Sequence, residues 1–228
     1  MTVYQYPPQT ALKRVIPKTR IYDGVAASTA LRDRFVREVD QITWAHKLAP
    51  ETLNLPATAA VPEIQVFRVT LKGDALHDDI LRAMDRAIPF PLLFELVAGA
   101  RIQPAAAYKR PSEAERGKWV LSDPLRGEWT AHDAPRAPLP VAVNMGVLYD
   151  RMLSALMPVA PVPGEDVESR LARLAAIRAK EREIAQLQSK LKRESQFNIK
   201  VTLHGQLAEA QAAFDHMKDP SKTGGGKP

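Results

Sequence analysis

The last third of the chain constrains its fold most, because it contains a long stretch that favours a helix and little else. Residues 158–163 contain three prolines, and residues 165–217 then contain no proline and a single glycine, Gly205. Proline and glycine are the residues that most often end a helix. The pattern therefore predicts a long helical segment that begins after a proline-rich break.

The central part of this helical segment has a pronounced net positive charge. Between Ser169 and Lys200 there are nine Lys or Arg residues and three Asp or Glu residues, a local excess of +6 that equals the formal net charge of the whole chain. A charge of this sign favours contact with phosphates or with an acidic partner, and we predict that Lys190, Lys192 and Arg193 bind DNA phosphates. A solvated helix face is the alternative interpretation.

Apolar residues recur along the same segment at near-heptad spacing, which is typical of helices that pack together. The stripe is weak near its centre, so one long helix and a two-helix hairpin both remain open. Because an isolated short stripe is marginal in water, we expect it to pack against a partner or a second copy of the chain. The predicted partner-binding residues are Ile184, Leu187, Leu191, Leu207 and Phe214.

The first two thirds predict an α+β domain with a mostly antiparallel sheet and flanking helices. A strand pattern at 61–71 is followed by a helix pattern at 78–88 and then by strand patterns at 92–97 and 102–108. A helix at 145–157 completes this domain. The order of a strand, a helix and then a run of strands indicates α+β with a mostly antiparallel sheet.

The beginning of the chain is expected to be extended over its first 27 residues, with a helix after it. Five residues then follow one another at helical spacing and predict one apolar helix face: Leu31, Phe35, Val39, Ile42 and His46. We therefore divide the chain into an α+β body (1–158), a proline-rich hinge (159–164), a basic helical arm (165–218) and a disordered tail (219–228).

Composition excludes several classes of protein. The chain has no cysteine, which removes disulfides, thiol nucleophiles and Cys-ligated zinc. No apolar run approaches the roughly 20 residues that span a bilayer, and the N-terminal MTVYQYPPQT lacks the charged and apolar regions of a signal peptide. We expect a cytoplasmic protein with no membrane contact, no metal and no cofactor.

Two residues, Glu95 and Lys109, are the only candidates for catalysis. A restriction-type nuclease needs an acid on one strand and an acid-x-Lys on the next strand to hold a divalent metal. Glu95 and Lys109 have this order, but the position two residues before Lys109 is Ala107. We therefore favour the interpretation that they form a cross-strand ion pair, and we predict no catalytic residue.

Cations and aromatic residues lie close together around residue 110. Single-stranded nucleic acids bind to surfaces that combine cations with aromatic side chains. Here the cations are Lys109, Arg110 and Lys118, and the aromatic residues are Tyr108 and Trp119. A solvated sheet edge collects the same residue types and is the favoured alternative.

Five phrases of the sequence are distinctive: KLAPETLNLP (47–56), VPEIQVF (61–67), AIPFPLLFEL (87–96), AAYKRPSEA (106–114) and RESQFNIKV (193–201). With them, the chain resembles a bacterial family catalogued as a domain of unknown function, and the resemblance extends from Tyr4 to about Met217. The resemblance implies a genomic context, because members are often encoded beside helicases and DNA methyltransferases in restriction-like phage-defence clusters. It implies no catalytic residue.

These observations favour a non-catalytic accessory subunit. It would dock onto a larger helicase or DNA methyltransferase subunit and touch DNA through its phosphates. A divergent metal-dependent nuclease is the first alternative, and a stand-alone nucleic-acid-binding module is the second.

Overall fold

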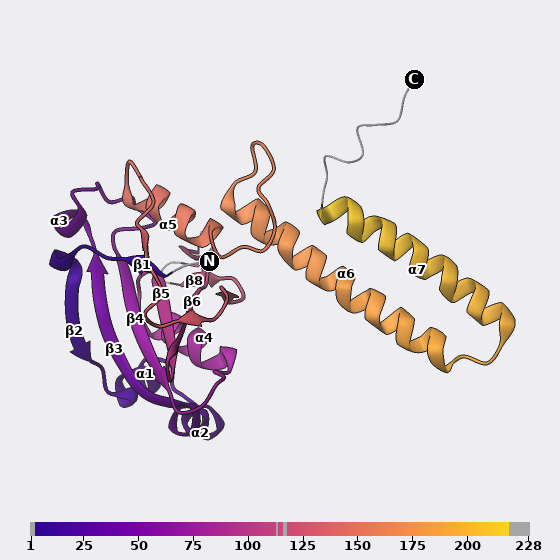
Figure 1. The fold of residues 1–228 in the computed structure, drawn as a ribbon, viewed down its shortest axis with the longest axis horizontal. Coiled ribbons are helices and arrows are strands. Elements are labelled where there is room, and N and C mark those ends of the chain that lie inside the picture. The colour runs from indigo at the N-terminus through magenta and orange to yellow at the C-terminus, as the bar shows by residue number, and fades with distance from the viewer. Residues whose placement is uncertain (1–2, 113, 116–117, 219–228) are drawn as a thin grey trace. The chain divides into compact units, whose positions relative to one another are not determined.

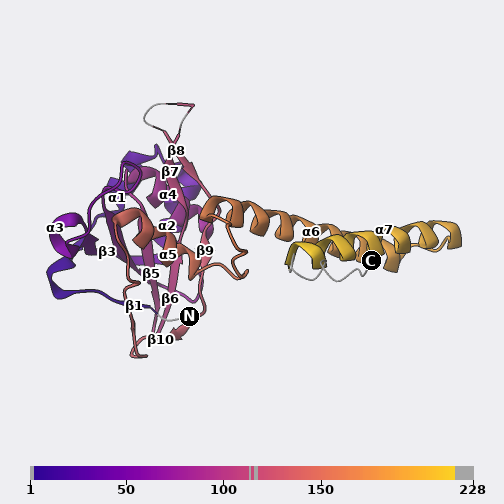
Figure 2. The ribbon, with the colours of Figure 1, turned by 90° about the horizontal axis from the view of Figure 1, so that it is seen from above.

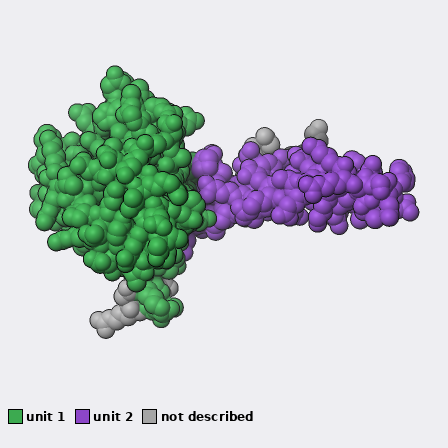
Figure 3. Space-filling model, turned by 90° about the horizontal axis from the view of Figure 1, so that it is seen from below, with its two compact units in different colours: residues 1–157 green, residues 158–228 purple. Residues whose placement is uncertain are grey.

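The computed structural model describes residues 3–112, 114–115 and 118–218, so the predicted tail at 219–228 lies outside the described residues. Contacts within the chain divide it into two compact units, Met1–Met157 and Pro158–Pro228 (Figure 3). No helix among the described residues is long and apolar enough to cross a bilayer.

The first unit is built on a seven-stranded sheet with the order β10-β6-β5-β4-β3-β2, in which β9 also pairs with β6 (Figure 1). Neighbouring strands are antiparallel except β4 and β5, which are parallel and are joined through helix α4. The predicted α+β class with a mostly antiparallel sheet is confirmed. The strands are β2 (Ala11–Val15), β3 (Val39–Leu48), β4 (Ile64–Leu71), β5 (Leu92–Ala98), β6 (Arg101–Ala106), β9 (Leu125–Arg126) and β10 (Thr130–Ala131).

Two short strand pairs accompany the sheet. Strand β1 (Tyr4–Gln5) is parallel to β11 (Ala137–Pro138), and β7 (Lys109–Pro111) is antiparallel to β8 (Trp119–Leu121). The first pair ties the N-terminal segment to a part of the chain more than a hundred residues away.

Three helices cover one face of the sheet. Apolar residues of α1 (Lys18–Gly24), α2 (Thr29–Glu38) and α4 (Asp78–Ala87) share one hydrophobic core with inward-facing strand residues. Ser28 precedes helix α2, and its hydroxyl accepts a hydrogen bond from the Leu31 amide, a common N-terminal cap. The main helical contributors to this core are Ile21, Phe35, Ile80, Leu81 and Met84.

The opposite face of the sheet packs against helix α5 (Met145–Ser154) and the N-terminal segment. Because side chains alternate along a strand, Leu93 and Glu95 of β5 face this side, whereas Phe94 faces the three-helix core. Asn144 caps the N-terminus of α5, and its side chain accepts a hydrogen bond from the Val147 amide at 2.8 Å. The remaining short helices are η1 (Pro8–Thr10) and α3 (Pro50–Leu53).

The prediction of one helix face from Leu31 to His46 is correct for its first half and wrong for its second half, which is a strand. Helix α2 ends at Glu38, and Val39 begins strand β3. Every third residue of β3 is buried (Val39, Ile42, Ala45 and Leu48) because the pairing with β4 shifts register twice. This three-residue spacing resembles that of a helix, which explains the error.

The expectation of an extended N-terminal region is also wrong in part. Strands β1 and β2 are extended, but residues 18–24 form helix α1, whose Ile21 is buried in the core. Pro17 precedes the first residue of α1, where its missing amide hydrogen removes no hydrogen bond within the helix.

The second unit is a helical hairpin of α6 (Val167–Arg193) and α7 (Phe197–Lys218), which lie side by side in both views (Figures 1 and 2). Of the two alternatives that the sequence left open, the hairpin is confirmed. Asp166 caps the N-terminus of α6, and its carboxylate accepts a hydrogen bond from the Ser169 amide at 2.7 Å. Arg173 reinforces this end of the hairpin through two 2.7 Å bonds to the Glu165 carboxylate.

Candidate functional site

Glu95 is a buried carboxylate that joins two arginines. It is 1 % exposed and lies on β5 directly opposite Arg68 of β4. Arg68 donates to Oε2 through Nε at 3.0 Å and Nη2 at 2.6 Å, and Arg136 donates to Oε1 through Nη1 at 2.7 Å. A buried charge with two such partners is satisfied, so the group is suited to holding elements together.

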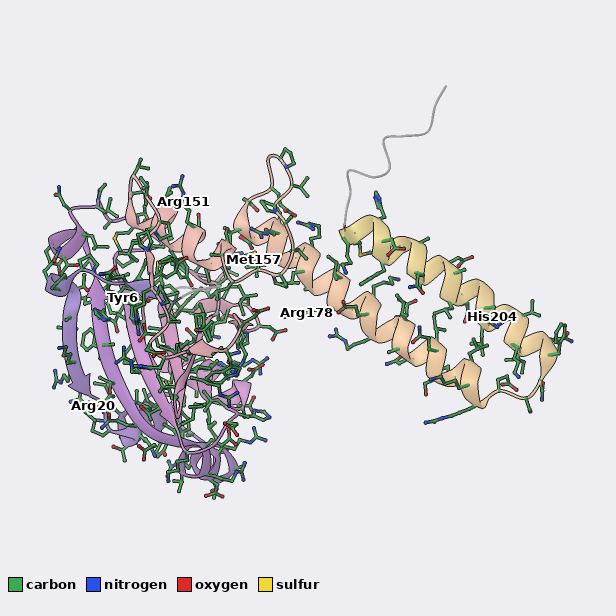
Figure 4. All side chains as sticks on the ribbon, viewed as in Figure 1. Tyr6, Arg20, Arg151, Met157, Arg178 and His204 are labelled. Carbon is green, nitrogen blue, oxygen red and sulfur yellow. The ribbon has the colours of Figure 1, made fainter. Side chains whose placement is uncertain are left out.

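The N-terminal segment closes over this ion cluster. Arg136 also donates to the Tyr4 carbonyl at 3.2 Å, and the ring of Tyr6 (Figure 4) lies 4.5 Å from the ring of His46. Nδ1 of His46 is 2.9 Å from the Thr10 hydroxyl. Glu95 therefore lies behind a layer formed by the N-terminal segment, η1 and β3.

Burial changes the titration of two groups in that layer. Burial raises the pKa of Tyr6 well above its ordinary value, and the negative charge of Glu95 adds to the effect. Burial lowers the pKa of His46, against a smaller opposite effect of Glu95, so His46 is neutral at pH 7. Neither group is therefore charged near neutral pH.

Lys109 is also buried, at 1 % exposure. Its ammonium group donates to the backbone carbonyls of Asp85 and Ile88, and Nζ lies 4.9 Å from the ring centroid of Trp119. In this conformation the lysine joins β7 to the end of α4. Its charge does not face solvent, where a nucleic acid would bind.

The side chain of Asp85 lies near Lys109 and is completely buried, and neither carboxylate oxygen has a hydrogen-bond partner. Burial raises the pKa of Asp85 to about 7, although the charge of Lys109 opposes the shift. Burial likewise lowers the pKa of Lys109 to about 8. Nearby, the Tyr149 hydroxyl of α5 donates to the Ala107 carbonyl at 2.6 Å, so three elements meet here.

Sequence reasoning did not identify Asp85, although a signal was present. The residue lies four positions after Leu81, and residues four apart share a face of a helix. Leu81 is fully buried, so the same spacing indicates that Asp85 is buried too. A charged residue on the apolar stripe of α4 is the feature to look for.

Glu95 and Lys109 are not brought together. Glu95 pairs with Pro104 across β5 and β6, and Lys109 follows five residues later, about 16 Å further along an extended chain. The favoured cross-strand ion pair is therefore wrong, because each residue has other partners. Among the described residues, no group of three His, Cys, Asp or Glu side chains is placed to hold a metal ion.

Arg110 and Lys118 lie on and beside the β7–β8 hairpin. The side chain of Lys118 is 68 % exposed and forms an ion pair with Glu115, and Arg110 donates to the Pro111 carbonyl at 3.4 Å. These two predicted nucleic-acid-binding residues thus lie near the surface, whereas the third, Lys109, is buried.

The predicted partner-binding residues of the arm close the hairpin itself. Ile184 and Leu187 of α6 are buried with Ala210 of α7, and Leu207 and Phe214 pack against them. The side chains on the inner sides of α6 and α7 point toward one another (Figure 4). Leu191 is half-buried near the end of α6. To bind another chain through these residues, the hairpin would have to open.

The end of the arm presents exposed cations beside exposed apolar residues. Lys190, Lys192 and Arg193 are exposed in the last turn of α6, and none forms an ion pair with a described residue. Phe197 and Val201 of α7 are 78 % and 56 % exposed. Cations at a helix C-terminus are stabilised by the helix dipole, which accounts for part of the cluster. The exposed apolar side chains have no such explanation. We call residues 190–201 the arm tip.

The chain matches a family model. The model described as domain of unknown function DUF4391 matches residues 5–214. No curated protein and no solved structure is significantly similar to the chain.

Proposed function

We propose that this chain, which belongs to the DUF4391 family, is a non-catalytic interaction subunit that contacts DNA phosphates through its arm tip. The observation that carries the proposal is the set of exposed cations Lys190, Lys192 and Arg193, none of which forms an ion pair with a described residue. Such groups add affinity by releasing the counterions of a nucleic acid, and that term is independent of sequence.

The shape of the arm supports this function. A hairpin brings the end of α6, the connecting loop and the start of α7 together. The cations of α6 and the exposed apolar residues of α7 therefore share the twelve-residue arm tip. Glu194, the one acid of the arm tip, accepts hydrogen bonds from the Ser195 and Gln196 amides at 2.8 Å each. Its carboxylate therefore caps the backbone of the loop and does not pair with the neighbouring cations.

The proposed partner is a larger helicase or DNA methyltransferase subunit of a restriction-like phage-defence system. This part of the proposal depends on the genomic context implied by the family resemblance. A role beside an enzyme also agrees with the separation of Glu95 from Lys109, since each is engaged in contacts that hold the fold together.

The test is a charge-reversal triple variant, K190E/K192E/R193E, compared with K13E/R14E/R20E. Both variants change the net charge equally, and the control residues are exposed on the first unit. Fluorescence anisotropy with a labelled DNA duplex is measured over a series of salt concentrations. We expect the arm variant to lose most of its affinity and to reduce the slope of log K against log salt by roughly 2–3.

Two results would contradict the proposal. Equal losses in the two triple variants would show that net charge alone is responsible. An unchanged affinity of the arm variant would move the contact to another surface, with Arg110 and Lys118 as the first candidates.

A further inference from the structure

A cavity of about 400 Å³ lies between the loop after α1, the beginning of α2, and α4. Helix α4 packs against both α1 and α2, so the cavity is bounded by elements of one core (Figure 1). Its volume is within the range of small-molecule sites. Three of its lining residues are arginines and one is an acid: Arg34, Arg82, Arg86 and Asp79.

Asp79 holds two of the arginines in place. Its Oδ2 pairs with Nη1 of Arg34, and its Oδ1 lies 3.4 Å from Nη1 of Arg82. Asp123 fixes Arg82 from a second direction at 2.7 Å. A guanidinium has five N–H groups, and these contacts use only part of them. Both arginines are therefore positioned in advance and keep donors for a further acceptor.

Arg86 adds a third positive charge to the lining. It follows Arg82 by four residues on α4, is exposed, and forms no ion pair with a described residue. Like charges at this spacing destabilise a helix, and a concave surface lined by one sign of charge strengthens its own field. The lining thus carries an uncompensated positive charge that an anion would offset.

The other side chains leave room for a ligand to approach. The loop after α1 and the start of α2 contribute mostly glycine, alanine and serine to the lining: Gly24, Ala26, Ala27, Ser28 and Ala30. Small residues let a bulky anionic group reach the guanidinium groups, whose planar fork matches the oxygens of a phosphate.

We propose that this cavity binds the phosphate group of a phosphorylated small molecule, such as a nucleoside diphosphate. A small ligand fits better than a polymer, because a polymer is bound by a continuous basic groove and not by a local hollow. The cavity is lined by residues between Gly24 and Arg86, and Asp123 of the same unit supports Arg82. Because no arm residue lines it, the proposal goes beyond the proposed function.

The experiment uses ADP and pyrophosphate, titrated into the full chain by isothermal titration calorimetry. Arg86→Gln removes one charge from the cavity at an exposed position. Arg37→Gln is the matched control, because Arg37 is an α2 residue outside the lining with a side chain that is 69 % exposed. We expect both probes to bind, Arg86→Gln to weaken binding by at least about tenfold, and Arg37→Gln to leave it unchanged.

The arm variant K190E/K192E/R193E completes the test and separates this site from the proposed function. It should keep the wild-type affinity for ADP even if its affinity for DNA is lost. The proposal is overturned if neither probe binds at millimolar concentration, or if Arg37→Gln weakens binding as much as Arg86→Gln. It is also overturned if Arg86→Gln lowers affinity for DNA while ADP does not bind, because the arginines would then belong to a nucleic-acid surface.

Discussion

Replacing Glu95 with alanine removes the carboxylate that joins Arg68 and Arg136. Three hydrogen bonds of 2.6–3.0 Å are lost, at a position that is 1 % exposed. Two guanidinium groups then remain in a region arranged around a negative charge. Because β4 contributes Arg68 and β5 contributes Glu95, the loss occurs at the centre of the sheet.

The expected cost follows from the burial of these groups. Removing one partner of a buried ion pair destabilises a protein by about 3–5 kcal/mol. The side chains of Arg68 and Arg136 are 35 % and 26 % exposed, so water partly solvates both unpaired guanidinium groups and reduces this cost. We therefore expect about 3 kcal/mol, which corresponds to a fall of roughly 6–12 °C in melting temperature for a unit of this size.

Thermal and urea denaturation measure the effect. Glu115→Ala is the control, because Glu115 also pairs with a cation but its side chain is 59 % exposed, and surface pairs contribute about 0–1 kcal/mol. If Glu95→Ala melts at the same temperature as Glu115→Ala, the cluster does not stabilise the sheet. The buried carboxylate would then need an explanation other than structure.

Three further predictions concern Asp85, the hairpin and the division into units. The pKa of Asp85 is raised to about 7, so its folded form holds a proton more tightly than the unfolded chain, and stability should fall as pH rises from about 4 to about 7. Urea denaturation should show that the free energy of unfolding of the wild type falls by at most about 4 kcal/mol over this range. Asp85→Asn should not show this fall, and parallel pH profiles of the two proteins would contradict the prediction. Leu187→Ala removes a side chain buried between α6 and α7, so far-UV circular dichroism should show lost helix. The exposed neighbour Gln186→Ala should not change the spectrum, and equal spectra would show that the hairpin does not depend on this contact. Deleting residues 158–228 should leave a first unit that melts cooperatively, since it has its own core, and aggregation of the truncated chain would refute this.

Local sequence signals were sufficient for several elements. The apolar spacing of Ile80, Leu81 and Met84 and the prolines after residue 88 predict α4, which the structure places at Asp78–Ala87. The glycine at position 99 predicts the turn between β5 and β6, where its φ of 55° is easily adopted without a side chain. These features depend on residues close in sequence, so the sequence alone could indicate them.

The arm shows where such signals end. The lack of proline over 165–217 predicts helix, but the choice between one helix and two depends on whether Ile184 and Leu187 find Ala210 on a returning segment. That contact joins residues more than twenty positions apart. Its free energy is a property of the packed hairpin, and neither half of the sequence contains it alone.

The polar clusters were decided by tertiary structure for the same reason. Glu95 is recognisable as an acid within an apolar strand, yet its partners lie 27 and 41 residues away and are brought to it by the parallel pairing of β4 with β5 and by the segment after β10. Lys109 was expected to pair with Glu95 or to lie at a solvated sheet edge, but it lies against the end of α4. Sequence determines which groups must be satisfied, whereas the fold determines which groups come close enough to satisfy them.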